Sequence, residues 1–554
     1  MTKYIFVVGG VMSSVGKGIA TASCAKLLES RGYDVTCVKV DPYINVDAGT
    51  MNPTEHGEVF VTDDGDETDQ DIENYERFLN KDILSTNYMT TGRVYSTVIN
   101  NERNLKYGGK CVEVVPHIPL EIIRRIKEAG KKAKADIVIT EIGGTIGEYQ
   151  NILFLEAARM MKLETPNDIA FIMVSYLPIP SMVGEMKTKP TQSAVRTLNS
   201  SGIQPDILLC RAEKAIDEKR KEKLSIFCNI PKDRIIPAPD VSSIYDVALN
   251  FKKGGLDDRI IEILRLEDRP TNDQLEKWNE LSQRIKSLKE EIKIGIVGKY
   301  FKTGDYVLAD SYISVIEAIK HACWEQNKKP VINWISSGEL EEEPEKLSEL
   351  SSYDGVIVPG GFGTRGIEGK IKAINYLREN DIPFLGLCYG MQLATIEFAR
   401  NVVGIKDATT EEMDPNAKNL IIHTMKEQIE KINNSNYGGT MRLGAYPCML
   451  KKDTKTYEGY GKDKISERHR HRYEFNNNYR EILEENGLVI SGTSPDNKLV
   501  EIIELPSNKF FIGCQFHPEL KSRPLNPHPL FVSFIEASTI NKKEKETKKV
   551  KIHS

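Results

Sequence analysis

Short apolar runs alternate with stretches of helical periodicity through the first 267 residues. YIFVVGG (4–10) and DVTCVKVD (34–41) are apolar runs, and GKGIATASCAKLLESRG (16–32) between them has helical spacing and ends at a glycine. Further apolar runs are ADIVITEIGG (135–144), DIAFIMVSYLP (168–178) and DILLCRAEKA (206–215). This alternation predicts a parallel sheet whose ligands bind at the carboxyl ends of the strands.

The pattern changes between residues 268 and 291, where charged residues dominate. The apolar positions there are Leu275, Trp278, Leu281, Ile285 and Leu288. Their helical spacing predicts a surface helix that links a first domain, 1–267, to a second one. Apolar runs such as IKIGIVGKY (292–300) resume the α/β pattern, so we expect a second α/β domain over 292–540. The lysine-rich end, 541–554, is predicted to be a disordered, solvated tail.

Composition narrows the class of protein without identifying it. A chain of 554 residues with 40% hydrophobic residues can build two large cores, and its formal charge of −5 gives no general attraction to nucleic acid or membrane. We find no signal peptide and no apolar run of 18 residues. The nine cysteines are scattered without a CxxC pair, which favours free thiols in the cytoplasm over disulfides or a zinc site.

The segment GGVMSSVGKG (9–18) has the composition of a phosphate-binding loop but departs from the usual signature. Five residues separate Gly10 from Gly16, where the signature has four, and Gly18 stands where a Ser or Thr normally binds Mg²⁺. Lys17 remains suited to a phosphate at a helix N-terminus. The loop alone therefore leaves open which residues would hold a metal.

A second constellation points to a thiol nucleophile in the second domain. PFLGLCYGMQ (383–392) places Cys388 between two glycines at a strand-to-helix turn, an elbow that exposes a nucleophile. A buried structural cysteine is the alternative explanation. PGGFGTRG (359–366) offers backbone N–H groups to an oxyanion, and CQFHPE (514–519) supplies a histidine and a carboxylate that could activate the thiol.

These three motifs, in this order, resemble the class I glutamine amidotransferase domain over about 293–537. The resemblance implies that Cys388 attacks the glutamine side-chain amide, that His517 transfers protons and that Glu519 orients His517. The oxyanion would be held by the N–H groups of Gly361 and Tyr389. The implied glutamine-binding residues are Gly361, Tyr389, Gly390, Met391, Gln392, Glu412 and Arg472, with Glu411 next to Glu412 as an open alternative.

The first domain resembles the amidoligase domain of the CTP synthase family. The resemblance is carried by KVDPYINVDAGTMNPTEHGEVFVTDDGDETDQD (39–71), EIGGTIGE (141–148), MKTKPTQ (186–192) and PDILLCR (205–211). It implies an α/β protein with a P-loop-type parallel-sheet domain, which aminates UTP to CTP with ATP and with ammonia from glutamine, in de novo pyrimidine nucleotide synthesis. It also implies Mg²⁺, activation by GTP, inhibition by CTP, and a homotetramer that can stack into filaments.

The resemblance assigns roles near the phosphate loop. Lys17 and Lys39 would stabilise the transferred phosphoryl group, although a lysine facing solvent is the alternative for Lys39. Asp71 and Glu141 would hold Mg²⁺. By chemistry alone Asp63, Asp64, Asp66, Glu67 or Asp69 could also serve, and the family pattern selects Asp71. The implied ATP-binding residues are Ser14, Val15, Gly16, Lys17, Gly18, Ile19, Asp71, Arg211, Pro239, Asp240 and Val241.

The remaining implied contacts concern the pyrimidine nucleotide and regulation. The UTP and CTP residues would be Ser13, Glu148, Tyr149, Gln150, Lys187, Thr188, Lys189, Pro190, Thr191, Gln192 and Lys223. From spacing alone, a solvated basic loop is the alternative explanation for Lys187 and Lys189. Thr440 and Arg442 would contact GTP, and His56 would gate the passage of ammonia.

One departure from the family has a predicted consequence. The family commonly reads GTxGDxE, whereas this chain reads GTIGEYQ, with Glu148 and Gln150 at the changed positions. We expect unchanged chemistry and weaker inhibition by CTP. The alternatives are an amidoligase acting on a substrate such as cobyrinic acid, an ATP-dependent switch or partition protein, and a structural role in filaments.

Overall fold

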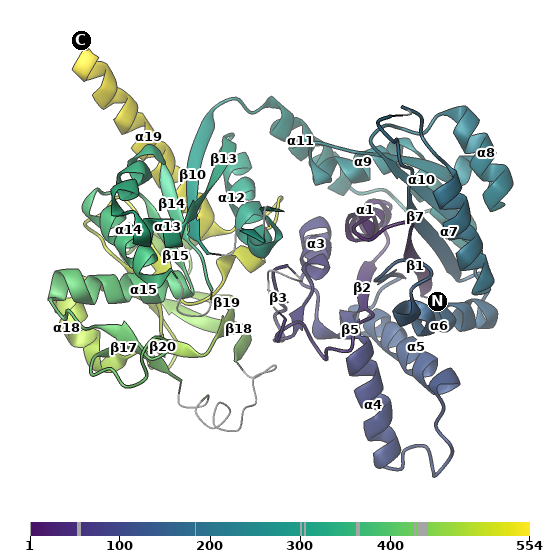
Figure 1. Ribbon diagram of the computed structural model, residues 1–554, viewed down its shortest axis with the longest axis horizontal. Coiled ribbons are helices and arrows are strands. Elements are labelled where there is room, and N and C mark those ends of the chain that lie inside the picture. Colours follow the sequence, from purple (N-terminus) through teal and green to yellow (C-terminus); the bar gives the residue numbers. More distant parts are fainter. Residues whose placement is uncertain are drawn as a thin grey trace. The chain divides into compact units, whose positions relative to one another are not determined.

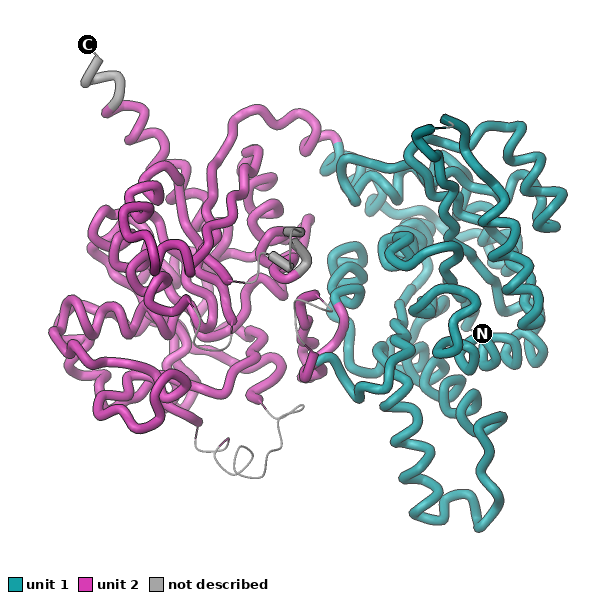
Figure 2. Tube along the Cα trace, viewed as in Figure 1, with its two compact units in different colours: residues 1–48, 70–282 teal, residues 49–69, 283–554 magenta. Residues whose placement is uncertain are grey.

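The structure of the chain, a computed structural model, divides into two compact units. It describes residues 2–51, 57–182, 184–299, 311–361, 366–425, 428 and 441–548, and the backbone alone at 302–303, 306–307, 309–310 and 549–553. Unit 1 comprises residues 1–48 and 70–282, and unit 2 comprises residues 49–69 and 283–554 (Figure 2). No helix in the described part of the chain is long and apolar enough to span a membrane.

Unit 1 is built on a seven-stranded sheet in which every neighbouring pair of strands is parallel (Figure 1). In sheet order the strands are β5 (Tyr88–Thr90), β2 (Val35–Asp41), β6 (Ile137–Ile142), β1 (Lys3–Gly10), β7 (Ile169–Tyr176), β8 (Ile207–Ala212) and β9 (Ile235–Pro239). From β1 the chain first builds β2, β5 and β6 on one side of β1, and then β7, β8 and β9 on the other side. This arrangement creates a switch point at the carboxyl end of β1, where open parallel sheets bind ligands. The predicted parallel sheet is confirmed.

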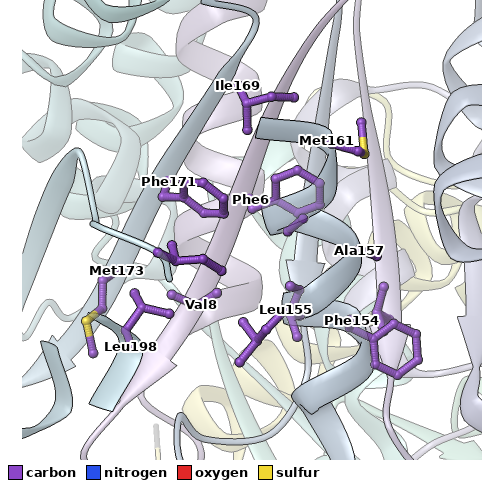
Figure 3. Packing of buried hydrophobic residues seen from close by; sticks show 14 of the residues in the cluster. Phe6, Val8, Phe154, Leu155, Ala157, Met161, Ile169, Phe171, Met173 and Leu198 are labelled. Atoms are coloured by element: carbon purple, nitrogen blue, oxygen red, sulfur yellow. The ribbon is translucent and has the colours of Figure 1, made fainter. Parts of the chain in front are cut away.

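Helices cover both faces of this sheet. One layer consists of α5 (Val114–Ala133), α6 (Ile152–Glu164), α7 (Lys189–Ser200) and α8 (Glu218–Cys228). The other layer contains α1 (Lys17–Ser30), α3 (Gln70–Leu79), α9 (Val247–Lys253) and α10 (Leu256–Leu264), and α4 (Thr91–Arg103) packs on α5. Figure 3 shows the first interface, where Phe6 and Phe171 of the sheet stack with their ring centroids 5.7 Å apart. Truncating either ring to alanine would cost about 3–5 kcal/mol, because both rings are fully buried.

Unit 2 is built on a nine-stranded mixed sheet. In order the strands are β13 (Lys329–Ser336), β10 (Glu291–Gly298), β14 (Gly355–Val358), β15 (Phe384–Leu387), β23 (Phe511–Cys514), β22 (Val500–Glu504), β21 (Val489–Thr493), β18 (Arg442–Leu450) and β19 (Lys464–His471). The pairs from β13 to β23 are parallel, and the later pairs are antiparallel. A small separate sheet contains β16 (Thr409–Thr410), β17 (Leu420–Thr424) and β20 (Tyr473–Phe475).

The helices of unit 2 also form two layers. On one face α14 (Ile367–Glu379) and α15 (Tyr389–Phe398) pack together, with α13 (Ser337–Glu342) beside α14. On the other face lie α12 (Ile313–Glu325) and α19 (Pro529–His553). Smaller helices are α17 (Lys455–Tyr460) and α18 (Arg480–Glu485).

The predicted disordered tail is wrong, because α19 continues as a helix to His553. Four of its apolar residues, Leu530, Phe531, Phe534 and Ile535, are fully buried in the core and anchor the helix. Lys542 and Lys545 then donate hydrogen bonds to the carbonyl oxygens of Glu291 and Ser351, at 2.7 and 2.8 Å. At least two lysines of this segment therefore attach the helix to the rest of unit 2.

The division of the chain differs from the predicted boundaries in two ways. The predicted linker helix is α11 (Gln274–Ser287), and the two units meet within it at residues 282 and 283. Residues 49–69, which the sequence places inside the first domain, belong by their contacts to unit 2. That segment forms a small antiparallel hairpin, β3 (Phe60–Val61) with β4 (Glu67–Thr68). Its acidic side chains explain why it belongs to unit 2.

Charge pairing holds segment 49–69 in unit 2. Asp63 accepts hydrogen bonds from Arg468 and Lys521, at 2.5 and 3.2 Å. Glu67 accepts one from Arg470 at 2.8 Å. Burial would raise the pKa of Asp63, but the cationic side chains of Arg468 and Lys521 outweigh it and hold that pKa below its usual value.

Candidate active sites

Cys388 lies on a strained elbow between β15 and α15. Its φ and ψ are 49° and −99°, a conformation that non-glycine residues rarely adopt. A Cβ on Gly386 would lie 2.8 Å from the backbone of Gly390, and one on Gly390 would lie 2.0 Å from the carbonyl oxygen of Val358. The two glycines are therefore required by close backbone packing, and the predicted elbow is present.

His517 and Glu519 form the predicted pair beside the elbow. His517 Nδ1 lies 2.7 Å from Glu519 Oε1, and the Glu519 side chain is 3% exposed. Burial would lower the pKa of His517, but the Glu519 carboxylate, together with the Cys388 sulfur when it is a thiolate, outweighs burial and raises that pKa well above its usual value. A carboxylate on Nδ1 leaves Nε2 as the nitrogen that can exchange a proton with the thiol.

A small cavity of about 70 Å³ adjoins the thiol. Its lining includes Cys388, His517 and the loop residues Gly360 and Gly361, together with Glu58 of segment 49–69. Phe362 to Arg365, in the middle of the predicted glycine-rich loop 359–366, lie outside the described residues. The first part of that loop therefore borders the nucleophile, as the oxyanion prediction requires.

The predicted glutamine-binding residues divide by environment. Met391 and Tyr389 have side chains buried in the core, so only their backbone can face a substrate. Gln392 is also buried, and its amide donates to the carbonyl oxygen of Tyr473 at 3.0 Å. Arg472 donates to Gln428 at 3.4 Å.

The structure distinguishes Glu411 from Glu412. The Glu411 carboxylate accepts a hydrogen bond from the backbone N–H of Thr424 and so helps to hold β17. Its own N–H donates to the carbonyl oxygen of Ile422. Glu412 is half-buried next to it. Burial lowers the pKa of the half-buried Lys299, and the charge of Glu412 partly offsets that effect. This supports Glu412 as the candidate substrate acid, which stays a prediction.

Two buried residues at this site were missed by the sequence reasoning. Gln515 donates from Nε2 to Cys388 Sγ at 3.6 Å, and Lys370 of α14 lies 3.4 Å from the carbonyl oxygen of Pro359. Burial and then the charge of Lys299 lower the pKa of Lys370 to about 7. Gln515 lies inside the quoted CQFHPE motif, so its position was available as a signal. Lys370 gave none, because nothing in its helical spacing distinguishes a lysine that will be buried.

In unit 1, the loop after β1 has the geometry of an anion-binding loop. Val11 and Ser14 have positive φ values of 79° and 54°, and Gly16 caps α1 with φ 91°. The first N–H groups of α1 lack intrahelical partners and carry the positive end of the helix dipole. Lys17, the first residue of the helix, donates to the carbonyl oxygen of Gly144 at 3.0 Å.

Gly18 is explained by the position of Asp71. A Cβ on Gly18 would lie only 1.9 Å from Asp71 Oδ1. A Ser or Thr at this position, as in the usual loop, would therefore displace the carboxylate. A hydroxyl-bearing side chain at position 18 and the Asp71 carboxylate from α3 would therefore compete for the same space.

At the carboxyl ends of β2 and β6, the buried side chains of Lys39 and Glu141 form a cluster with the partly exposed Asp71. Lys39 is ion-paired with Asp71 and, at 3.2 Å, with Glu141, whose other oxygen accepts a hydrogen bond from Tyr75. Burial and then the nearby charge of Asp71 raise the pKa of Glu141 to about 6. Asp41, which the sequence reasoning did not select, also lies 3.5 Å from Lys39 Nζ.

The acidic residues between Asp63 and Asp71 have different partners in the structure. Asp63 and Glu67 pair with arginines of unit 2, and Asp64 accepts a hydrogen bond from Thr62 at 2.7 Å. Asp71 is the residue that lies with Glu141. Over the described residues no group of three or more His, Cys, Asp or Glu side chains is arranged as a complete metal site. Two carboxylates that share a site with phosphate oxygens are nevertheless what Mg²⁺ commonly uses.

A cavity of about 350 Å³ adjoins the phosphate loop, of a size suited to part of a nucleotide. Seven of the predicted ATP residues line it: Val15, Gly16, Ile19, Arg211, Pro239, Asp240 and Val241. Two of these lining residues are joined by a hydrogen bond, which Arg211 donates to Asp240 at 3.0 Å. Apolar groups of α9, including Phe251, complete the lining.

The predicted pyrimidine-nucleotide residues fall into two groups. Lys187 and Thr188 precede α7, which begins at Lys189 with Pro190 in its first turn, so the segment ends in a helix N-terminus suited to phosphate. The side chains of Thr191 and Gln192 are buried and hydrogen-bonded inside unit 1.

The second group lines a separate cavity of about 630 Å³. Glu148, Tyr149 and Gln150 border it with residues of α4 and α6, and Gln150 donates to Glu148 at 2.7 Å. Ser13 and Lys223 are exposed and line neither this cavity nor the one beside the phosphate loop. The structure therefore brings the two groups into one unit without joining them in one pocket.

The regulatory predictions meet the structure only in part. His56 and Thr440 lie outside the described residues. Arg442 is buried, donates to Glu501 at 2.7 Å and stacks on the ring of Tyr446 at 4.5 Å. Its guanidinium is therefore already engaged within unit 2.

The two sites define a class of protein. An elbow thiol with a His–Glu pair on a mixed α/β sheet is the arrangement of a class I glutamine amidotransferase, and it is joined here to a phosphate-loop domain on a parallel sheet. The chain matches the family models "CTP synthase N-terminus" over residues 3–266 and "Glutamine amidotransferase class-I" over residues 307–537.

Relatives extend the match over nearly the whole chain. The CTP synthase of Carboxydothermus hydrogenoformans is 52% identical, over 97% of this chain and 99% of its own length. That of Nostoc punctiforme is 49% identical, over 97% of each chain. A solved glutaminase domain of Trypanosoma brucei CTPS with bound acivicin is 37% identical, covers 45% of this chain and 94% of its own, and has a TM-score of 0.42. The chain belongs to the CTP synthase family.

Proposed function

We propose that the two sites carry out separate halves of one reaction, in which ATP activates UTP and glutamine supplies the nitrogen. Membership of the family gives the conversion of UTP to CTP with glutamine, by a glutamine-hydrolysing C–N ligase. The observation that carries the proposal is the pairing, in one chain, of the Cys388–His517–Glu519 set with the cluster of Lys39, Asp71 and Glu141.

Hydrolysis of glutamine begins at Cys388. His517 Nε2 takes the thiol proton, and the thiolate forms a bond to the side-chain amide carbon while the carbonyl electron pair moves to oxygen. The N–H groups of Gly361 and Tyr389 stabilise that oxyanion. His517 returns its proton to the departing nitrogen, ammonia leaves, and water then attacks the thioester to release glutamate and the thiol.

Activation of UTP takes place beside the phosphate loop. The uracil O4 attacks the γ-phosphorus of ATP, and the bond from that phosphorus to the β,γ-bridging oxygen breaks to give ADP. Lys17 and Lys39 offset the charge on the transferred group. Ammonia then bonds to C4, and the C4–O4 bond breaks to release phosphate and CTP.

Mg²⁺ fits this site, because Gly18 leaves room for Asp71 and because Asp71 and Glu141 both reach Lys39 Nζ. These two carboxylates would hold the ion, which supplies charge neutralisation to the phosphates when bound. Burial and Coulomb repulsion raise the pKa of Glu141 to about 6, and an ion at this point would favour its ionised form.

Regulation and assembly follow as proposals from the family. We infer activation by GTP, inhibition by CTP and a homotetramer in the cytoplasm. Tyr149, whose side chain is 93% exposed beside the 630 Å³ cavity, supports a nucleotide or subunit contact there. Filament formation stays a prediction.

Ultraviolet monitoring of UTP conversion tests the proposed function. We expect CTP to form with ATP, Mg²⁺ and glutamine, and to stop forming when ATP is omitted. Conversion of UTP without ATP, or a chain that hydrolyses glutamine yet leaves UTP unchanged under all conditions, would contradict it.

A further inference from the structure

Gln515 lies directly against the nucleophile, in a position fixed from both ends. Its side chain is 1% exposed, and its backbone N–H donates to the carbonyl oxygen of Glu501 at 2.8 Å. Its Nε2 lies 3.6 Å from Cys388 Sγ, within the range for a hydrogen bond to sulfur. The end of β23 thus presents an amide to the thiol on one side, and His517 follows two residues later.

The orientation of that amide follows from its neighbours. Tyr473 contributes a backbone carbonyl, which can only accept, and Gln392 Nε2 lies 3.0 Å from its oxygen. The same nitrogen lies 3.1 Å from Gln515 Oε1. Since the carbonyl fixes Gln392 as the donor, Gln515 must accept with its oxygen and direct its N–H groups toward the sulfur.

We propose that Gln515 is a further catalytic residue of glutamine hydrolysis, whose side-chain N–H donates to Cys388 Sγ and stabilises the thiolate. The thiolate exists twice in each turnover. It forms when the proton passes to His517 Nε2, and it forms again when water attacks the glutamyl thioester and the C–S bond breaks with its electron pair on sulfur. A hydrogen bond to a charged acceptor is stronger than one to a neutral acceptor, so the amide favours both steps.

The series of hydrogen bonds from Tyr473 through Gln392 and Gln515 to Cys388 also connects substrate binding with activation of the thiol. Gln392, a predicted glutamine contact, has a buried Oε1 that accepts no hydrogen bond in the described structure. A substrate ammonium or N–H group bound there would polarise the Gln392 amide and strengthen its donation to Gln515. The proposal for Gln515 rests on the nucleophilic role of Cys388, so the test has to distinguish a failure of one role from a failure of the other.

The test is the pH dependence of Cys388 alkylation by iodoacetamide, read by mass spectrometry in the full chain. Gln515→Met keeps similar length and removes the donor, and Gln515→Glu keeps the shape but opposes negative charge to the thiolate. We expect the thiol pKa from the profile to rise by about one unit in the Met variant and by more in the Glu variant. We also expect kcat/KM for glutamine to fall about 10- to 100-fold through kcat.

Two controls keep the result interpretable. Gln326→Met removes a half-buried amide elsewhere in unit 2, where Gln326 donates to the carbonyl oxygen of Val532, and should leave the profile unchanged. CTP synthesis from ammonium should stay within about two-fold in every variant that folds.

The outcomes separate this proposal from the proposed function. If alkylation of Cys388 in the native chain leaves glutamine hydrolysis intact, the nucleophile itself is wrong. If alkylation inactivates the native chain but both Gln515 variants titrate as it does, Gln515 acts only in packing and the proposal is overturned.

Discussion

At the phosphate loop, Lys39 lies against the carboxylates of Asp71 and Glu141, whereas at the thiol site Lys370 is buried against the carbonyl oxygen of Pro359. In the first arrangement the positive charge of Lys39 is neutralised by two carboxylates. Carboxylates are also the protein groups that commonly bind Mg²⁺. Over the described residues Lys370 has no ion-paired carboxylate. The two buried lysines therefore differ in their surroundings: Lys39 is neutralised by carboxylates, whereas Lys370 is held by a backbone carbonyl, and the carboxylate of the thiol site, Glu519, pairs with His517 instead.

The largest expected effect comes from breaking the balanced site. Gly18→Ser places a side chain where Asp71 Oδ1 would be 1.9 Å away, so the carboxylate must leave Lys39. We expect CTP synthesis to fall about 100-fold or more with either glutamine or ammonium, because both use the activated UTP. Initial rates with each nitrogen source measure this.

A matched glycine gives the control for that change. A Cβ on Gly338 would meet only Ser336 Oγ at 3.8 Å, so Gly338→Ser should keep full activity. If Gly18→Ser lowers only the glutamine-dependent rate, the assignment of Asp71 to the nucleotide site is wrong.

A stability measurement sharpens the other half of the comparison. Burial and Lys299 lower the pKa of Lys370 to about 7, against an ordinary value of 10.5. The unfolded chain therefore binds more protons between these two values, and the free energy of unfolding should rise with pH across that window. The gain contributed by Lys370 should reach up to about 4 kcal/mol and should be absent in Lys370→Met.

Denaturant midpoints of the native chain and the variant, from pH 6.5 to about 10.5, measure this difference. Lys372→Met is the matched control, since Lys372 lies in the same helix and donates to the carbonyl oxygen of Glu341. Parallel curves for the native chain and Lys370→Met would contradict the lowered pKa of Lys370.

The smallest expected effect concerns feedback at the nucleotide side. Gln150 donates to Glu148 at 2.7 Å, and Gln150→Glu replaces that hydrogen bond with two like charges while restoring the family pattern at position 150. We expect a few-fold gain in inhibition by CTP, with little change in the uninhibited rate. Inhibition titrations of both proteins measure it, and an unchanged or weaker inhibition would count against the prediction.

The sequence predicted both sheets, the elbow and the pairing of His517 with Glu519, because these depend on local pattern and on motifs with fixed spacing. It could not divide the acid-rich loop, since Asp63 and Asp71 differ only in which unit folds around them. It also missed the docking of α19, because composition alone does not reveal carbonyl groups that will accept from its lysines.

Gly18 shows most clearly what the structure adds. In the sequence it is a defect in a phosphate loop, since the magnesium-binding hydroxyl is missing. In the structure it is the space that the Asp71 carboxylate occupies. That relation joins residues 53 positions apart and is visible only when α1 and α3 are packed together.

The central claim is that ammonia is made at Cys388 and used at the separate nucleotide site. The most direct measurement compares Cys388→Ala with the native chain in CTP formation from UTP, ATP and Mg²⁺, supplied with either glutamine or ammonium. We expect the variant to lose the glutamine-dependent reaction and to keep the ammonium-dependent rate. A folded variant that fails with ammonium as well, or that still uses glutamine, would contradict this division of labour.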